Sequence, residues 1–248
     1  MHNTFSVENK IIIITGGSRG IGFYLGTELS KQGAIVYALS RTLPKNNKKN
    51  TNLNFIKCDI TNKKKFQSIC KNIIKKNSKI DVLINNAGIT FSGNSEKYAE
   101  KDWFKTIEIN LTSSFNCSQV VLPYMKKQKQ GSIINVTSIN SKLAFPDNPA
   151  YIASKGGLRM LTKSLARDWG KYGIRVNNLA PGYFVTDMNK KTYSNKKTRI
   201  SRTEKTMLKR WGNLSDLLGP CLFLASDASE YVTGIDLFVD GGWVSNGL

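Results

Sequence analysis

Tyr151 and Lys155 are the pair of residues whose types and spacing best fit acid–base chemistry. They are four positions apart in a stretch with helical spacing, so their side chains share one face of a helix. A free phenol has a pKa of about 10 and is a poor base at neutral pH, but a neighbouring ammonium stabilises the phenolate and lowers that pKa. The only histidine is His2, so tyrosine, lysine and carboxylates must carry any proton transfer near neutral pH. We therefore expect Tyr151, with its pKa lowered by Lys155, to act as the general acid–base.

Two further polar residues, Ser138 and Asn110, are candidates for the same site. Ser138 ends an apolar run 13 positions before Tyr151, and ligands bind at the carboxyl ends of such strands. Asn110 lies inside a long helical stretch, where asparagine is unfavourable, and this indicates a polar task. Ser141 is a nearby hydroxyl, but its spacing of ten positions from Tyr151 fits less well than that of Ser138. Taken singly, each residue also fits an ordinary turn, cap or surface position.

A glycine-rich turn, TGGSRGIG at residues 15–22, lies between the first apolar run and the first helical stretch. Glycines there permit a tight turn and let a pyrophosphate approach the backbone, while the following helix offers unpaired N–H groups. Glycines also end strands for purely steric reasons, but this placement between strand and helix favours a dinucleotide site. The predicted cofactor-binding residues of the turn are Gly16, Ser18, Arg19, Gly20, Ile21 and Gly22.

The second apolar run ends in Ser40 and Arg41, which bears on the choice between two nicotinamide cofactors. NAD-binding proteins usually carry an acidic residue there, which bonds the ribose 2′-hydroxyl. Ser40 has no charge to repel a 2′-phosphate, and the guanidinium groups of Arg41 and Arg19 could hold one. We predict NADP(H) in preference to NAD(H). The alternative is that both arginines belong to a generally basic surface.

The elements that must position these residues alternate along the chain. Seven short runs, apolar on both faces, predict buried parallel strands: Lys10–Thr15, Ile35–Leu39, Asn54–Cys58, Ile80–Asn85, Ser132–Thr137, Arg175–Ala180 and Ile235–Val239. Stretches with helical spacing separate them: Ile21–Gln32, Lys63–Lys76, Trp103–Lys127, Pro149–Trp169 and Leu214–Ala225. This alternation predicts one α/β domain over residues 1–248, a Rossmann-type doubly wound parallel sheet of about seven strands flanked by helices.

Two segments depart from that alternation. Pro44–Asn52 is polar and predicts a surface loop. Tyr183–Gly212 is polar and basic, has no clean period and is too long for an ordinary loop. We expect this segment, called the lid segment below, to carry short helices and to cover a substrate site.

Composition excludes several other classes of protein. The chain has 248 residues, and no apolar run approaches the roughly 18 residues of a membrane span. Residues 1–8 lack the basic-then-apolar order of a signal peptide, so we expect a cytoplasmic protein. The four cysteines are far apart, without CxxC spacing, and are expected to be reduced, buried and free of metal. The net charge of +20 is compatible with nucleic-acid binding. The lysines are, however, scattered among asparagines and isoleucines, as AT-rich coding would produce, so we interpret them as solvent-exposed side chains rather than as a nucleic-acid-binding surface.

These motifs together resemble the short-chain dehydrogenase/reductase family over nearly the whole chain. The resemblance rests on TGGSRGIG at 15–22, Asp59, NNAG at 85–88, Asn110, Ser138, YIASK at 151–155, PG at 181–182 and the late VDGGW. It implies a homotetramer that packs the long helices and the last strand. Within the family the chain is similar to two groups, gluconate 5-dehydrogenases and 3-oxoacyl-(acyl-carrier-protein) reductases, and PGYF and ASDASEYVTG favour the first.

The resemblance also implies a role for individual residues. Tyr151 would exchange a proton with the substrate oxygen, Ser138 would hydrogen-bond that oxygen, and Lys155 would also bind the nicotinamide ribose. Asn110 would hold a water that links Lys155 to solvent. Asp59 and Ile60 would contact the adenine. The remaining expected cofactor contacts line the groove or the nicotinamide: Asn86, Ala87, Gly88, Pro181, Gly182, Phe184 and Thr186.

The resulting hypothesis is an NADP-dependent oxidoreductase that transfers a hydride between nicotinamide and a small carbonyl or secondary alcohol, of the sugar-acid or polyol type. One alternative is a 3-oxoacyl-(acyl-carrier-protein) reductase. An alternative of another class is a non-catalytic NADP-binding sensor or scaffold. The lid segment contains six basic residues that would suit an anionic substrate or an acidic carrier protein: Lys190, Lys191, Lys196, Lys197, Arg199 and Arg202.

Overall fold

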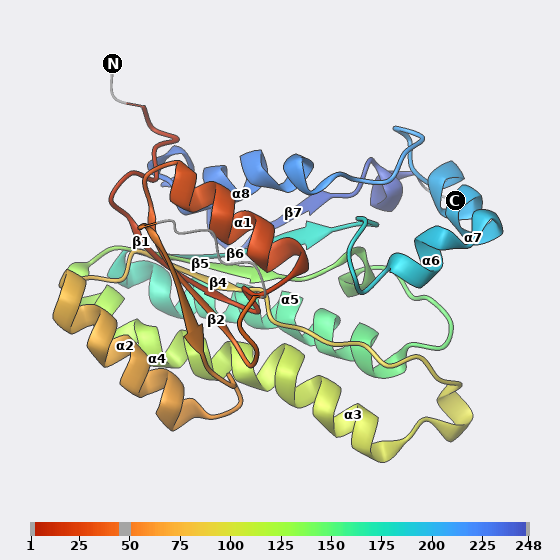
Figure 1. Ribbon diagram of the computed structural model, residues 1–248, viewed down its shortest axis with the longest axis horizontal. Helices are drawn as coiled ribbons and strands as arrows, with labels where there is room; N and C mark the ends of the chain where they lie inside the picture. The colour runs from red at the N-terminus through yellow and green to blue at the C-terminus, as the bar shows by residue number, and fades with distance from the viewer. Residues whose placement is uncertain (1–2, 45–50, 247–248) are drawn as a thin grey trace.

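The computed structural model describes residues 3–44 and 51–246, and its centre is one parallel sheet (Figure 1). The alternation of apolar runs predicted about seven parallel strands, and the structure pairs seven in the order β3-β2-β1-β4-β5-β6-β7. The strands are β1 Ile11–Thr15, β2 Ile35–Ser40, β3 Leu53–Lys57, β4 Val82–Asn85, β5 Gly131–Val136, β6 Ile174–Pro181 and β7 Asp236–Val239. Most of the surface loop expected at Pro44–Asn52 lies outside the described residues.

Helices cover both faces of the sheet (Figure 1). On one face lie α1 (Gly20–Lys31) and α8 (Leu218–Ala225), and on the other α2 (Lys63–Asn77), α4 (Ser113–Gln128) and α5 (Pro149–Trp169). Alternate residues of β1 belong to two separate cores: Ile12 and Ile14 pack on the α1 side, and Ile11 and Ile13 pack on the α2 side. Burial on both faces explains why the strand reads as an unbroken apolar run.

The helix expected at Trp103–Lys127 is not continuous. It consists of α3 (Glu100–Ile107), a π-helical turn (Glu108–Thr112) and α4. Asn110 lies in the π turn, and its side chain bonds both backbone groups of Ile89: Oδ1 accepts from the N–H at 2.8 Å, and Nδ2 donates to the carbonyl at 2.9 Å. Single π turns interrupt helices at functional sites, and here the wider turn accompanies a buried polar contact that sequence periodicity does not detect.

The strands are all parallel, so the carboxyl ends of β1, β4, β5 and β6 lie along one edge of the sheet, and the strand order reverses between β1 and β4. In open α/β sheets, ligands bind in the crevice at such a switch point. The lid segment follows β6 and carries two short helices, α6 (Lys190–Ser194) and α7 (Lys196–Glu204), as predicted. Within the described ranges, no helix is long and apolar enough to cross a membrane.

Candidate active site

Tyr151 and Ser138 meet at the carboxyl end of β5. Tyr151 lies in the first turn of α5, which begins at Pro149, while Ser138 follows β5 in extended conformation. Burial raises the pKa of the Tyr151 phenol above its ordinary value of 10.0; a side-chain hydrogen bond with Ser138 lowers it in part, and the neighbouring phenol of Tyr183 raises it further. Tyr151 is therefore a protonated phenol at neutral pH, hydrogen-bonded to Ser138.

Lys155 is buried one helical turn after Tyr151. Its Nζ lies 5.7 Å from the centroid of the Tyr151 ring and donates a hydrogen bond of 2.7 Å to the carbonyl of Val136. Burial lowers the pKa of the lysine to about 8, so the ammonium form still predominates at pH 7. Our expectation that Lys155 lowers the pKa of Tyr151 is wrong for this structure. The ammonium is bonded to the strand carbonyl, and desolvation of the phenol is the largest influence on its pKa.

Gly88, Asn110 and Lys155 converge beside this pair. A Cβ at Gly88 would lie 3.4 Å from Asn110 Oδ1 and 3.6 Å from Lys155 Nζ. Asn110 also donates to Ser154 Oγ at 3.0 Å, so both of its amide hydrogens are used. Its side chain therefore braces the segment after β4 against α5, and the water relay implied for it stays a prediction.

The glycine turn fits a pyrophosphate. Gly16 has φ +70°, and a Cβ there would lie 2.9 Å from the Cα of Ala87; a Cβ at Gly22 would overlap the carbonyl oxygen of Gly16. These close approaches require glycine. Within the described residues no side chain caps the N-terminus of α1, and its first turn holds no acidic residue. The backbone N–H groups at this helix start are thus available for an anion.

Asn86 and Ala87 hold the glycine turn in place. The backbone N–H groups of both donate to Thr15 Oγ1 at 3.1 Å, and Asn86 Nδ2 donates to the Thr15 carbonyl at 2.9 Å. Thr186 of the lid segment is 3.9 Å from where a Cβ of Gly20 would be. The fold therefore brings Gly16, Asn86 and Ala87 together and places Thr186 beside Gly20, although Asn86 also has a structural role that the sequence did not reveal.

Two expected contact residues have buried side chains. Ile60 is 7% exposed and belongs to the core on the α2 side; Phe184 is 2% exposed, belongs to the other core and packs against Gly212. The contacts expected of Ile60 with adenine and of Phe184 near the nicotinamide stay predictions, and the backbone of these residues would have to make them. Asp59 stays exposed and accepts from the N–H and Oγ1 of Thr61 at 3.1 and 2.9 Å.

The other predicted cofactor-binding residues lie in the glycine turn, directly after β2, or at the end of β6. The N–H groups of Gly16 and Gly17 both donate to the carbonyl of Leu39, which brings the glycine turn to the end of β2. Arg19 and Arg41 are both exposed there. Ser18 and Ile21 lie in or directly after the turn, and Pro181 ends β6, where the Gly182 N–H donates to the Val239 carbonyl at 2.9 Å. Ser141 Oγ donates to the Ser138 carbonyl at 2.6 Å.

A buried polar ladder beneath the site was missed. Asn85, Asn135, Asn178 and Asp236 are in register across β4 to β7. Asn85 Nδ2 donates to Asn135 Oδ1 at 2.8 Å, and Thr162 of α5 joins Asn135 to Asn178. The sequence signal for this ladder was the polar side chains that interrupt or end otherwise apolar runs.

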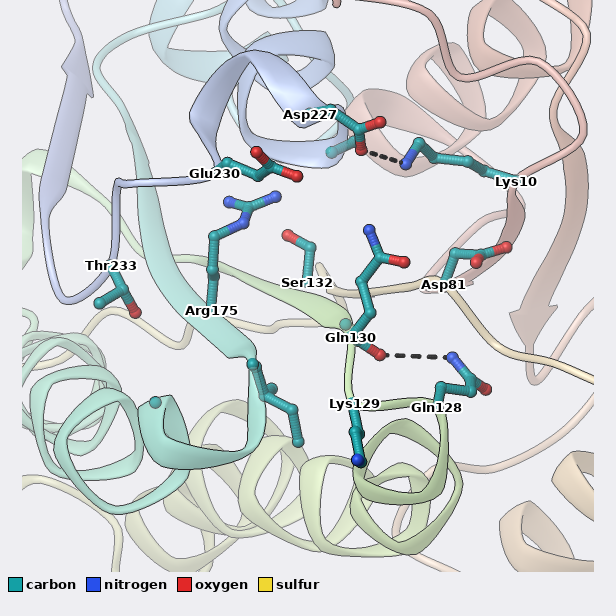
Figure 2. A pocket seen from close by; sticks show the side chains of 15 residues that line it. Lys10, Asp81, Gln128, Lys129, Gln130, Ser132, Arg175, Asp227, Glu230 and Thr233 are labelled. Atoms are coloured by element: carbon teal, nitrogen blue, oxygen red, sulfur yellow. Dashed lines mark hydrogen bonds and ion pairs between the residues drawn. The ribbon is translucent and has the colours of Figure 1, made fainter.

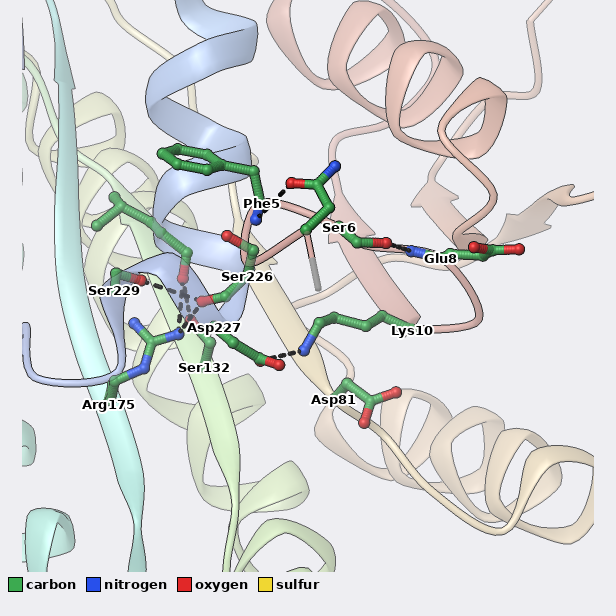
Figure 3. Close-up of polar contacts among 12 residues, drawn as sticks. Phe5, Ser6, Glu8, Lys10, Asp81, Ser132, Arg175, Ser226, Asp227 and Ser229 are labelled. Carbon is green, nitrogen blue, oxygen red and sulfur yellow. Dashed lines mark hydrogen bonds and ion pairs between the residues drawn. The ribbon is translucent and has the colours of Figure 1, made fainter. Parts of the chain in front are cut away.

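A cavity of about 450 Å³ at the opposite, amino-terminal edge of the sheet contains none of the predicted site residues (Figure 2). Lys10 pairs with Asp227 at 2.7 Å, and Arg175 Nη2 donates to the carbonyls of Leu224 and Ser226 (Figure 3). These contacts connect β1 and β6 to α8 and the segment after it. We therefore conclude that the charged side chains of this cavity stabilise the fold.

The four cysteines are buried, as expected. Cys58, Cys70, Cys117 and Cys221 form no disulfide, and burial raises the pKa of Cys70 and of Cys221 to about 12. Over residues 3–44 and 51–246, no group of three or more His, Cys, Asp or Glu side chains could hold a metal ion.

Known proteins are similar to this chain in sequence and in architecture. A family model described as short chain dehydrogenase matches residues 10–197. The chain is 35% identical over 249 residues to 5-keto-D-gluconate 5-reductase of Escherichia coli K12, covering 98% of both. It is also 35% identical over 242 residues to a 3-oxoacyl-(acyl-carrier-protein) reductase of Staphylococcus epidermidis, covering 94% of this chain and 98% of that one. A solved gluconate 5-dehydrogenase of Burkholderia cenocepacia J2315, in complex with NADP and tartrate, matches with a TM-score of 0.90 at 33% identity, covering 98% of both chains.

Proposed function

Since the chain belongs to the short-chain dehydrogenase/reductase family and is an oxidoreductase of CH–OH and C=O groups, we propose that it transfers a hydride between NADP(H) and a small sugar acid or polyol. The observation that carries this proposal is the meeting of Ser138, directly after β5, and Tyr151, in the first turn of α5, beside the buried ammonium of Lys155. The relatives named for 5-keto-D-gluconate and gluconate support the substrate class, and the complex of the Burkholderia protein with NADP supports the cofactor.

In the direction of reduction, Tyr151 donates its phenolic proton to the substrate carbonyl oxygen, while the Ser138 hydroxyl donates a hydrogen bond to the same oxygen. The raised pKa of Tyr151 keeps this proton in place at neutral pH. Lys155, whose ammonium lies beside the phenol, would bind the nicotinamide ribose. A bound nicotinamide dinucleotide supplies the hydride, and its pyrophosphate would be held by the glycine turn at residues 15–22. Arg19 and Arg41 would hold the 2′-phosphate of NADP.

The second candidate is reduction of 3-oxoacyl thioesters on a carrier protein. The Staphylococcus epidermidis relative favours it, as do the basic side chains of the lid segment. Lys190, Lys191, Lys196 and Lys197 are all exposed, and an acidic carrier protein would match their charge.

One panel separates these functions. Ketones, sugar acids and 3-oxoacyl thioesters are offered with NADPH, and with NADH in parallel, and consumption of the reduced cofactor is followed by absorbance. We expect the fastest turnover with 5-keto-D-gluconate and NADPH. A preference for thioesters would support the second candidate, and turnover of no compound would favour a non-catalytic NADP-binding sensor.

We also propose a cytoplasmic homotetramer. Phe104 on α3 and Met160 on α5 are 60% and 59% exposed, and such apolar surface on the long helices suits contact with further copies of the chain. Light scattering coupled to gel filtration tests the assembly.

A further inference from the structure

Aromatic side chains that follow three neighbouring strands form a cluster beside Tyr151. Phe145 follows β5, Tyr183 follows β6 and Trp243 follows β7. The ring centroids of Tyr183 and Trp243 are 5.2 Å apart, and those of Phe145 and Trp243 are 5.7 Å apart. Phe145 belongs to the segment that joins Ser138 to Tyr151, and its ring centroid lies 6.3 Å from that of Tyr183. The cluster is thus connected directly to the segment that carries the reacting groups.

Arg202 of α7 packs its guanidinium against this cluster. Its Cζ lies 5.1 Å from the centroid of Phe145, 5.2 Å from that of Tyr183 and 5.8 Å from that of Trp243. Across the described residues, no carboxylate, carbonyl or hydroxyl accepts a hydrogen bond from Arg202. By contrast, Arg210 of the same segment donates to both carboxylate oxygens of Asp216, at 2.6 and 3.0 Å.

This combination suits recognition of an anion. Stacking on aromatic rings fixes the plane of a guanidinium and removes part of its water, but it leaves the N–H groups at the edge free. A carboxylate fits that edge with two parallel, charge-assisted hydrogen bonds. Because Arg202 stacks on Phe145, which lies in the segment between Ser138 and Tyr151, a small molecule could reach from the arginine to the phenol.

We propose that Arg202 binds a carboxylate of the substrate and thereby selects acidic carbonyl compounds over neutral ones. The inference rests on the proposed function, since it assigns a specificity residue to the same site. Arg202 is a binding residue here, and the proton transfer remains with Tyr151.

The test is the affinity of the NADPH-loaded protein for D-gluconate and for D-glucitol, measured by titration calorimetry. D-glucitol is D-gluconate with CH₂OH in place of the carboxylate, and neither compound can accept a hydride from NADPH, so both form stable complexes. Arg202→Gln removes the charge, while Arg202→Lys keeps it without the planar fork. The control is Lys205→Gln, because Lys205 is the C-cap of the same helix and its side chain is exposed.

We expect the wild type to bind gluconate more tightly than glucitol. Arg202→Gln should weaken the binding of gluconate about 10- to 100-fold, as expected for one charge-assisted contact. It should leave the affinity for glucitol unchanged, so the discrimination between the two ligands is lost. Arg202→Lys should keep part of the discrimination, and Lys205→Gln should keep all of it. Equal weakening of both ligands by Arg202→Gln would show that the arginine only holds the lid segment in place and would overturn the proposal. Absence of discrimination in the wild type, or its equal loss in Lys205→Gln, would also overturn it. Failure of the proposed function would appear separately, as absent turnover in the carbonyl panel.

Discussion

Lys155 Nζ donates its hydrogen bond to the backbone carbonyl of Val136, 2.7 Å away, and no carboxylate within the described residues pairs with it. The ammonium is therefore buried with one neutral partner, and its pKa falls to about 8. A charge held in this way destabilises the fold while serving the site, a conflict common in active sites.

Replacing Lys155 with Met should remove this conflict. A fall in pKa from 10.5 to about 8 corresponds to about 3 kcal/mol against the buried ammonium, and loss of the bond to Val136 opposes the gain by about 1 kcal/mol. We expect Lys155→Met to be more stable by about 2 kcal/mol at pH 7 and to lose turnover.

The pH dependence of the stability difference between the wild type and Lys155→Met tests whether the buried ammonium causes it. Between about pH 8 and 10.5, the unfolded wild type binds more protons at Lys155 than the folded protein does, so its stability rises with pH relative to Lys155→Met. Below about pH 8 the difference should be constant. Urea unfolding of both proteins at several pH values measures it, and the cysteines and Tyr151, common to both, cancel to first order. A difference that does not change with pH would contradict this account.

Tyr151→Phe should separate catalysis from binding. The substitution removes only the phenolic oxygen, so we expect turnover to fall by about 10³-fold while NADPH binding is unchanged. Steady-state rates and NADPH fluorescence titration provide the two readouts. Tyr231→Phe is the control, because that side chain is fully exposed and should leave both readouts unaltered. Equal loss of binding and turnover in Tyr151→Phe would instead indicate a structural role.

Gly22→Ala should disrupt the glycine turn. The new Cβ would overlap the Gly16 carbonyl oxygen and the side chain of Asn86, the residue that holds the turn. Overpacking of this kind costs about 1–3 kcal/mol, so we expect NADPH affinity to fall at least about 10-fold. Gly219→Ala on α8 is the control, because a Cβ there meets no atom within 4 Å and should stabilise the helix slightly. Unchanged NADPH affinity in Gly22→Ala would show that the turn does not hold the cofactor.

The choice of cofactor should depend on Arg19 and Arg41. Replacing both with Ala should lower kcat/KM for NADPH about 10- to 100-fold, because charge-assisted bonds to the 2′-phosphate are lost. The value of kcat/KM for NADH should change little. Arg167→Ala removes an equally exposed charge from α5 and should affect neither cofactor. A wild type that strongly prefers NADH would contradict the assignment outright.

The sequence by itself determined the elements and the order of the motifs along them. Hydrophobic period and glycine placement are local properties, so the apolar runs located all seven strands and the TGGSRGIG turn located the start of α1. The four-residue spacing likewise put Tyr151 and Lys155 on one helix in consecutive turns. Asn110 was singled out as a polar residue in a helix, although the π turn around it was not foreseen.

Only the tertiary structure decided the environment of these groups. The pKa of Tyr151 rises because the folded chain excludes water and places Tyr183 beside it, and Lys155 bonds a carbonyl of β5 rather than the phenol. Phe184 enters the core, and Arg202 rests on rings from three separate loops. Desolvation and electrostatic coupling depend on distances between segments far apart along the chain, and local patterns carry no information about them.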